Sequence, residues 1–99
     1  MNEKMDEYTA VLEENIRENG VALETVVAME ELAELIQAIS KVKRYGFVGE
    51  YRDNLIEEIA DVDIVITELL MAFNVSEDEF FSVLDRKIQR IKSRLEERR

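Results

Sequence analysis

The chain lacks both cysteine and histidine throughout its 99 residues. These absences exclude disulfide bonds, metal sites built from thiolates or imidazoles, and catalysis by Ser-His or Cys-His pairs. Proline is also absent and only three glycines occur, so few positions can interrupt a helix. We therefore expect any metal or acid-base chemistry to use carboxylates.

Long apolar segments are absent as well. No 18 consecutive residues are apolar, and the first residues, MNEKMDEYTAV, lack the apolar core of a signal peptide. The net charge of −10 disfavours binding to nucleic acids and to anionic membranes, because both attract basic surfaces. We expect a cytoplasmic protein that binds neither nucleic acid nor membrane.

Hydrophobic residues make up 46% of the chain and charged residues 36%, a balance typical of amphipathic helices. The sequence predicts an all-α fold, in which residues 1–99 form a single domain, a bundle of about four helices. Apolar residues at spacings of three and four predict helices over residues 3–19, 22–45, 54–74 and from 76 to the C-terminus.

Local signals support the ends of these helices. Asn19-Gly20 and Tyr45-Gly46 are typical of helix stops, and Ser76 to Glu79 form a capping box. Asn54 and Glu57 have the spacing of a second capping pair, although the third helix alternatively begins near Glu50. The segment GFVGEYRD at 46–53 is the expected mobile loop.

A second apolar face on the helix over residues 22–45 contains Leu23, Val26 and Val27. These side chains point away from the main apolar stripe, so one covering layer is not enough for this helix. A chain of about 100 residues also gains stability by burying apolar surface in an assembly. We expect a homodimer or a homotetramer.

Two pairs of carboxylates interrupt the apolar stripes. Glu31 and Glu34 lie on one flank of one predicted helix, and Glu58 and Asp61 lie on one flank of another. Four converging negative charges are unfavourable without a cation, and Mg²⁺ prefers such oxygen ligands together with substrate phosphates. An alternative interpretation is that all four are solvated flanks of an acidic protein, as we expect for Glu24, Glu30 and Glu57. Glu-x-x-His ligation of a di-iron site is excluded, because histidine is absent.

The spacing of these acids resembles a family signature. EELAE at 30–34 and EEIAD at 57–61 are similar to the E-x-x-E and E-x-x-D motifs of the all-α nucleoside triphosphate pyrophosphohydrolases, in particular the small MazG-like proteins of bacteria and phages. The resemblance covers the two acidic helices and the loop between them, and more loosely the basic last helix. It implies hydrolysis of a nucleoside triphosphate to a nucleoside monophosphate and pyrophosphate, in nucleotide house-cleaning or pool control.

The resemblance also implies roles for individual residues. Glu31, Glu34, Glu58 and Asp61 would bind Mg²⁺, with Mn²⁺ as a substitute, and we choose Glu34 from these four as the base that orients the water. Residues 86–99 contain seven Lys or Arg against two Glu. They either match the dipole of the helix end or form a phosphate-binding wall. The expected phosphate-binding residues are Lys87, Arg90 and Arg94, followed by Lys41 and Arg44.

Two other functions remain open at this point. One is a noncatalytic helical interaction module or an inactive relative, for which neutralising the paired acids would change no function. The other is a hydrolase that acts on a different phosphorylated metabolite. The base and the sugar of a nucleotide substrate have no recognisable motif in this sequence.

Overall fold

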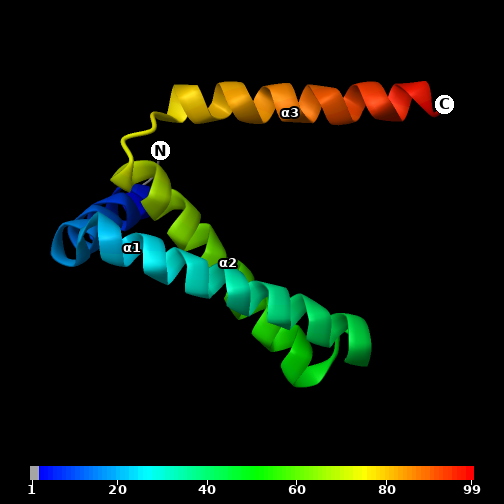
Figure 1. Ribbon diagram of the computed structural model, residues 1–99, viewed down its shortest axis with the longest axis horizontal. Coiled ribbons are helices and arrows are strands. Elements are labelled where there is room, and N and C mark those ends of the chain that lie inside the picture. Colours follow the sequence, from blue (N-terminus) through cyan, green and yellow to red (C-terminus); the bar gives the residue numbers. More distant parts are fainter. Residues whose placement is uncertain (1–2) are drawn as a thin grey trace.

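The protein is built from α-helices alone over residues 3–99, the part of the chain that the structure, a computed structural model, describes. The helices are α1 (Glu3–Tyr45), α2 (Gly49–Ala72) and α3 (Glu77–Glu97) (Figure 1). The all-α prediction is confirmed for this part of the chain. Residues 1 and 2 of the predicted domain lie outside it. None of the three helices is long and apolar enough to cross a membrane.

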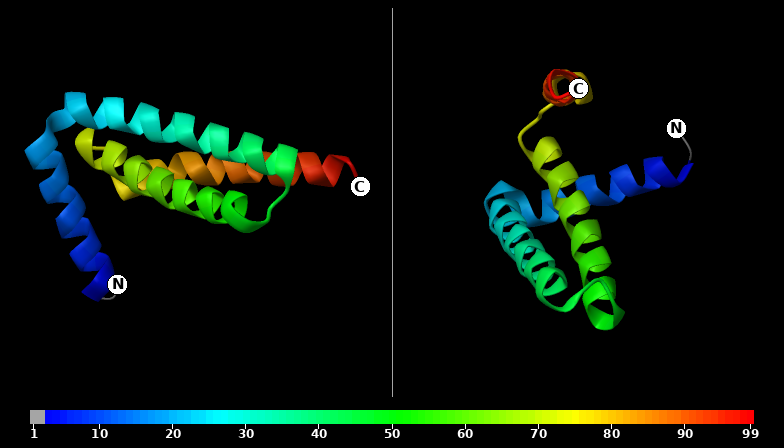
Figure 2. Two further views of the ribbon diagram at one scale, coloured as in Figure 1. Left: turned by 90° about the horizontal axis from the view of Figure 1, so that it is seen from below. Right: turned by 90° about the vertical axis from the view of Figure 1, so that its right-hand side faces the viewer.

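A break at Gly20 divides α1 into two segments. Gly20 has φ 80° and ψ 158°, a combination that is essentially restricted to glycine. The first segment, residues 3–19, therefore turns away from the second and crosses α2 (Figure 2). The predicted count of four helices is corrected to three, because the expected stop at Asn19-Gly20 is a kink of one residue, after which the helix continues.

The connection between α1 and α2 is shorter than predicted. Gly46, at φ 98°, ends α1 and donates its N–H to the Val42 carbonyl at 2.7 Å. Helix α2 begins at Gly49 with Val48 as its N-cap, so the alternative start near Glu50 is confirmed. Asn54 and Glu57 lie inside the helix, and their predicted capping role is wrong. The connection consists of residues 46–48, so the expected loop over residues 46–53 is too long. The rings of Tyr45 and Tyr51 stack across the connection, with centroids 4.9 Å apart.

The second segment of α1 packs antiparallel to α2 (Figures 1 and 2). Ala28 and Ala38 of α1 are buried between the helices, as are Val62 and Val65 of α2. The small alanine side chains let the two backbones approach closely. No large side chain is fully buried among the described residues, so this hairpin has only a small core.

The turn from α2 to α3 follows a helix-ending pattern and then a capping pattern. Asn74 adopts a left-handed φ of 57°, and the N–H of Val75 donates to the Leu70 carbonyl at 2.9 Å, as in a Schellman motif. Ser76 then caps α3, its Oγ accepting a 3.1 Å bond from the N–H of Glu79. The predicted capping role of Ser76 is therefore confirmed.

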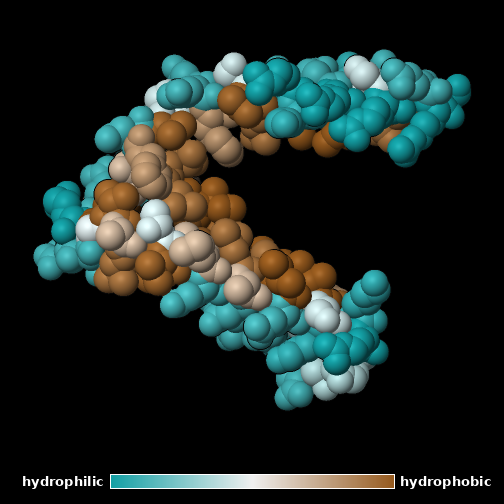
Figure 3. Space-filling view, in the orientation of Figure 1, coloured by the Kyte–Doolittle hydropathy of each residue, from teal (hydrophilic) through white to brown (hydrophobic). Residues whose placement is uncertain are grey.

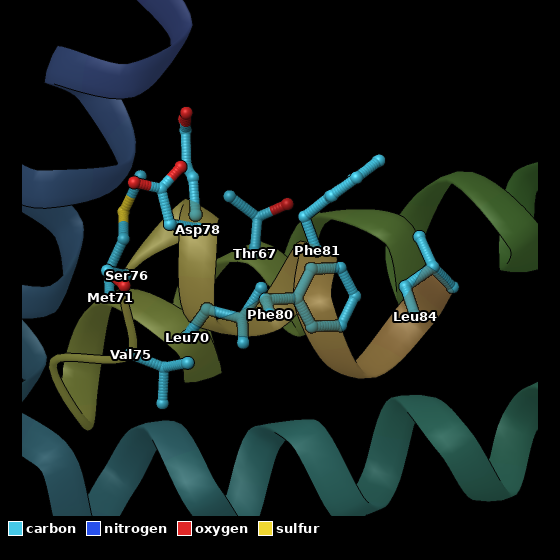
Figure 4. A pocket seen from close by; sticks show the side chains of 10 residues that line it. Thr67, Leu70, Met71, Val75, Ser76, Asp78, Phe80, Phe81 and Leu84 are labelled. Atoms are coloured by element: carbon cyan, nitrogen blue, oxygen red, sulfur yellow. The ribbon is translucent and has the colours of Figure 1, made fainter. Parts of the chain in front are cut away.

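Helix α3 stands apart from the α1–α2 hairpin. No Cα atom of α3 lies close to one of α1 or α2, and the helix leaves the hairpin across an open gap (Figure 1). The two parts meet only near their connection, where a hollow is lined by Leu70, Met71, Phe80, Phe81 and Leu84 (Figure 4). The expected bundle is thus not closed within one chain over the residues that are described.

Candidate metal centre

The antiparallel packing of α1 on α2 brings the predicted acidic pairs together. Glu31 and Glu34 are one turn apart on α1, and Glu58 lies opposite them on α2. Carboxylate oxygens of these three residues all lie within 4.8 Å of one another. Sequence spacing alone placed each pair on one flank, and the short α1–α2 turn sets the register that makes the pairs converge.

Two oxygens of this cluster have no hydrogen-bond partner. Oε2 of Glu31 and Oε2 of Glu58 are buried, and neither accepts a hydrogen bond from any described residue. Glu34, by contrast, is exposed to solvent. A buried acceptor without a donor is unfavourable, and more so when it is charged. The two buried oxygens therefore favour a positively charged ligand between the helices.

The pKa values of these carboxyl groups respond to the crowding. The pKa of Glu31 is raised above its ordinary value, first by loss of hydration and then by the charges of Asp61, Glu34 and Glu58. The pKa of Glu58 is raised by the same loss of hydration and by the charges of Glu34 and Asp61. Asp61 thus belongs to the same electrostatic cluster. Among residues 5–99, whose side chains the structure describes, the only ion pair joins Arg52 to Asp53, and this pair does not neutralise the cluster.

The oxygens of the cluster are spaced slightly wider than the ligands of a small divalent cation. Oxygen ligands of Mg²⁺ lie about 2.0–2.1 Å from the metal, so two of them are at most ~4.2 Å apart across an octahedron. The Glu31, Glu34 and Glu58 oxygens lie within 4.8 Å of one another, which is about 0.6 Å wider than this limit. The donors are all carboxylate oxygens, which suit Mg²⁺ and Mn²⁺ better than softer metals.

The predicted phosphate-binding cations are not gathered at this cluster. Lys87, Arg90 and Arg94 are exposed on α3, which does not pack on the hairpin of its own chain. Lys41 follows Glu34 by seven residues on α1, so both occupy the same side of that helix. Arg44 is held at the end of α1, where it donates to Ser40 Oγ at 3.3 Å and lies over the Tyr45 ring.

A second acidic layer, which sequence reasoning missed, lies along the same helix interface. Glu24 and Glu68 are 2% and 3% exposed, which corrects the expectation that Glu24 is a solvated flank. Asn15 Nδ2 donates to Glu68 Oε2 at 2.7 Å and to Glu24 Oε1 at 3.5 Å, and Asn19 Nδ2 donates to Glu24 Oε1 at 3.0 Å. This layer therefore finds its donors within the chain, whereas Glu31 and Glu58 do not.

The sequence did contain a signal for this second layer. Glu24 precedes Glu31 by seven residues and Glu68 follows Asp61 by seven, so each lies two turns along the same helix face. The pKa of Glu68 is raised by burial, lowered by the hydrogen bond from Asn15, and raised again by Glu24. The two amide donors of the layer, Asn15 and Asn19, lie one turn apart on α1 just before Gly20, which gives the layer a structural role at the kink.

No protein-family model, no curated protein and no solved structure matches this chain. The functional interpretation of the carboxylates therefore depends on their geometry, their burial and the chemistry of their oxygen atoms.

Proposed function

We propose that this protein is a Mg²⁺-dependent enzyme that hydrolyses a nucleoside triphosphate to a nucleoside monophosphate and pyrophosphate. The observation that carries the proposal is the convergence of Glu31, Glu34 and Glu58, two of which have buried oxygens without a hydrogen-bond donor. Such a site calls for a divalent cation, and Mg²⁺ held by a few carboxylates commonly binds substrate phosphates as well. The resemblance of EELAE and EEIAD to the MazG-like motifs supports this substrate class.

The four carboxylates have different surroundings and therefore different proposed roles. Glu31 and Glu58, whose buried oxygens lack donors, hold the cation together with Asp61. Mg²⁺, when bound, neutralises phosphate charge and lowers the pKa of a bound water. Glu34 is exposed, so its carboxylate can face the substrate, orient the attacking water and accept its proton.

The leaving pyrophosphate also needs cationic partners. Lys41 lies on the Glu34 side of α1 and is the nearest such partner along the helix. Lys87, Arg90 and Arg94 have no assigned role at this site, because α3 stands away from the hairpin. We propose a role in nucleotide house-cleaning or pool control, with Mn²⁺ able to replace Mg²⁺.

A panel of common and modified ribonucleoside and deoxyribonucleoside triphosphates, incubated with Mg²⁺ and with EDTA, tests this function. We expect Mg²⁺-dependent turnover of at least one triphosphate, and a loss of orders of magnitude in Glu58→Gln. Glu57→Gln is the matched control, because Glu57 is the neighbouring residue but is exposed. Absence of turnover across the panel, or equal activity of the two variants, would refute the proposed site.

A further inference from the structure

The protein exposes two apolar surfaces that face each other across the gap between the hairpin and α3. Figure 3 shows apolar residues on both sides of this gap. The first surface, the hairpin face, is formed by exposed residues of α1 and α2: Met29, Leu32, Ile36, Ile39, Ile59 and Ile66. The second, the α3 stripe, consists of Phe80, Leu84, Ile88, Ile91 and Leu95, each at least 40% exposed.

Helix geometry explains why the hairpin face is continuous. On α1, Leu32 and Ile39 come directly after Glu31 and Ala38, which face α2. On α2, Ile59 and Ile66 come directly after Glu58 and Val65, which face α1. One position is a rotation of about 100°, and in an antiparallel pair this rotation leads to the same side of both helices. The two helices thus present one joint apolar surface, on the side of the hairpin turned away from Glu34.

The amount of exposed surface shows that one chain alone is incompletely packed. A compact protein of 11.6 kDa exposes about 5,800 Å², whereas this chain exposes 7998 Å², roughly 2,200 Å² more. Its radius of gyration is 16.7 Å, against about 13 Å for a compact domain of this length. Obligate dimers commonly bury about 1,000–2,500 Å² per subunit, so the excess matches what a second subunit would cover.

The charges of the chain favour a second copy as the covering partner. Residues 86–99 carry a net charge of about +5 and the rest of the chain about −15, by counting ionised side chains. Lys87 and Arg94 are seven residues apart and border the α3 stripe. A basic, apolar helix on an acidic, apolar hairpin is complementary in both respects, as at coiled-coil seams flanked by charged residues.

We propose that two copies of this chain exchange α3, so that the α3 stripe of each copy packs on the hairpin face of the other. The arrangement is isologous, because the same two surfaces meet twice about one two-fold axis. It covers both surfaces without any change in the hairpin, and the connection at residues 73–76 already holds α3 away from its own hairpin. This inference does not depend on the proposed hydrolysis.

Mass measurement combined with mixing of two variants tests the exchange. Light scattering should give twice 11.6 kDa for the native protein at micromolar concentration. Ile88→Glu places a charge in the α3 stripe, and Ile36→Glu places one in the hairpin face. Each variant alone should dissociate at least about tenfold more readily, since both of its contacts contain a buried charge. Ser93→Glu and Gln37→Glu, on the outer sides of α3 and α1, are the matched controls and should remain dimeric.

Mixing the two variants distinguishes exchange of α3 between two copies from packing of α3 on its own hairpin. In a mixed dimer, the intact α3 of the Ile36→Glu chain meets the intact hairpin face of the Ile88→Glu chain, so one of the two contacts is native and dimers should reappear. A native protein that is monomeric at micromolar concentration would overturn the proposal. So would variants that stay folded by circular dichroism and fail to form mixed dimers, because α3 would then pack on its own hairpin.

Discussion

The side-chain amide of Asn15 donates a 2.7 Å hydrogen bond to Glu68 Oε2, which joins two positions 53 residues apart. This bond fixes the first segment of α1 against the end of α2. It also gives the buried carboxylate of Glu68 a donor in a place that water does not reach freely. The geometry of the kink and the electrostatics of the helix interface are therefore coupled through one residue.

Asn15→Ala should destabilise the fold by about 1–3 kcal/mol, because Glu68 would keep its buried charge and lose its donor. Urea unfolding of the single and double variants measures this coupling. In a Glu68→Ala background, the Asn15→Ala substitution should lower the free energy of unfolding much less than it does in the native chain. Equal costs in both backgrounds would show that the bond does not contribute to stability.

Removal of the Glu68 charge should stabilise the protein at neutral pH. The pKa of Glu68 is raised by burial above its ordinary value of 4.5, so the folded state binds a proton more readily than the unfolded chain. The free energy of unfolding therefore falls as pH rises from 4.5 through the raised pKa, and the loss persists at pH 7. Glu68→Gln keeps an acceptor for Asn15 and should have the higher Tm at pH 7, with a difference that shrinks towards pH 4.5.

Thermal unfolding in EDTA across this pH range measures the effect. Glu14→Gln is the control, because Glu14 is exposed on α1 and should leave the pH dependence unchanged. Parallel Tm profiles for Glu68→Gln and the native protein would contradict the assigned direction of the pKa shift.

Gly20→Ala should destabilise the protein, although the same substitution inside a straight helix usually stabilises it. Alanine stabilises a helix interior by about 0.5–1 kcal/mol relative to glycine. A backbone at φ 80° and ψ 158° destabilises residues other than glycine by about 1–3 kcal/mol, which is the larger effect. Denaturant unfolding gives the sign directly. An increase in stability would mean that α1 is straight at this position.

Mg²⁺ should raise the Tm of the native protein, since a ligand that binds only the folded state stabilises it by about 2.7 kcal/mol at 100 times its dissociation constant. Glu58→Gln should remove most of this response while raising the Tm in EDTA, because it relieves the crowding of like charges at Glu31 and Glu34. Glu57→Gln should retain the Mg²⁺ response. Differential scanning calorimetry with and without Mg²⁺ compares the three proteins, and an unchanged response in Glu58→Gln would argue against the metal centre.

Much of the helical structure is predictable from local patterns. The apolar spacing and the Ser76 cap predict α3, and Asn19-Gly20 predicts the interruption of α1, because these signals act through nearby backbone atoms. The predicted boundaries at residues 19 and 22 agree with the break at Gly20, but the pattern did not show how the two segments of α1 are oriented relative to each other. Nor did it show that α3 leaves the hairpin, because periodicity identifies an apolar face without identifying which surface covers it.

The candidate site was predictable in part for a similar reason. Helical spacing placed Glu31 with Glu34 and Glu58 with Asp61, but only the register of the α1–α2 turn decides that the two pairs meet. Glu24 was expected to be solvated because most glutamates are, and its burial depends on amide donors from the far side of the Gly20 kink. Such a contact requires tertiary structure.

Hydrolysis in ¹⁸O-labelled water tests the central claim most directly, because it identifies the phosphorus atom that the water attacks. With Mg²⁺ and a triphosphate that is turned over, we predict that the label enters the nucleoside monophosphate, that pyrophosphate is unlabelled, and that no diphosphate accumulates early. Early formation of nucleoside diphosphate and labelled orthophosphate would place the attack at the γ-phosphorus and contradict the account, even if Glu31, Glu34 and Glu58 all proved essential.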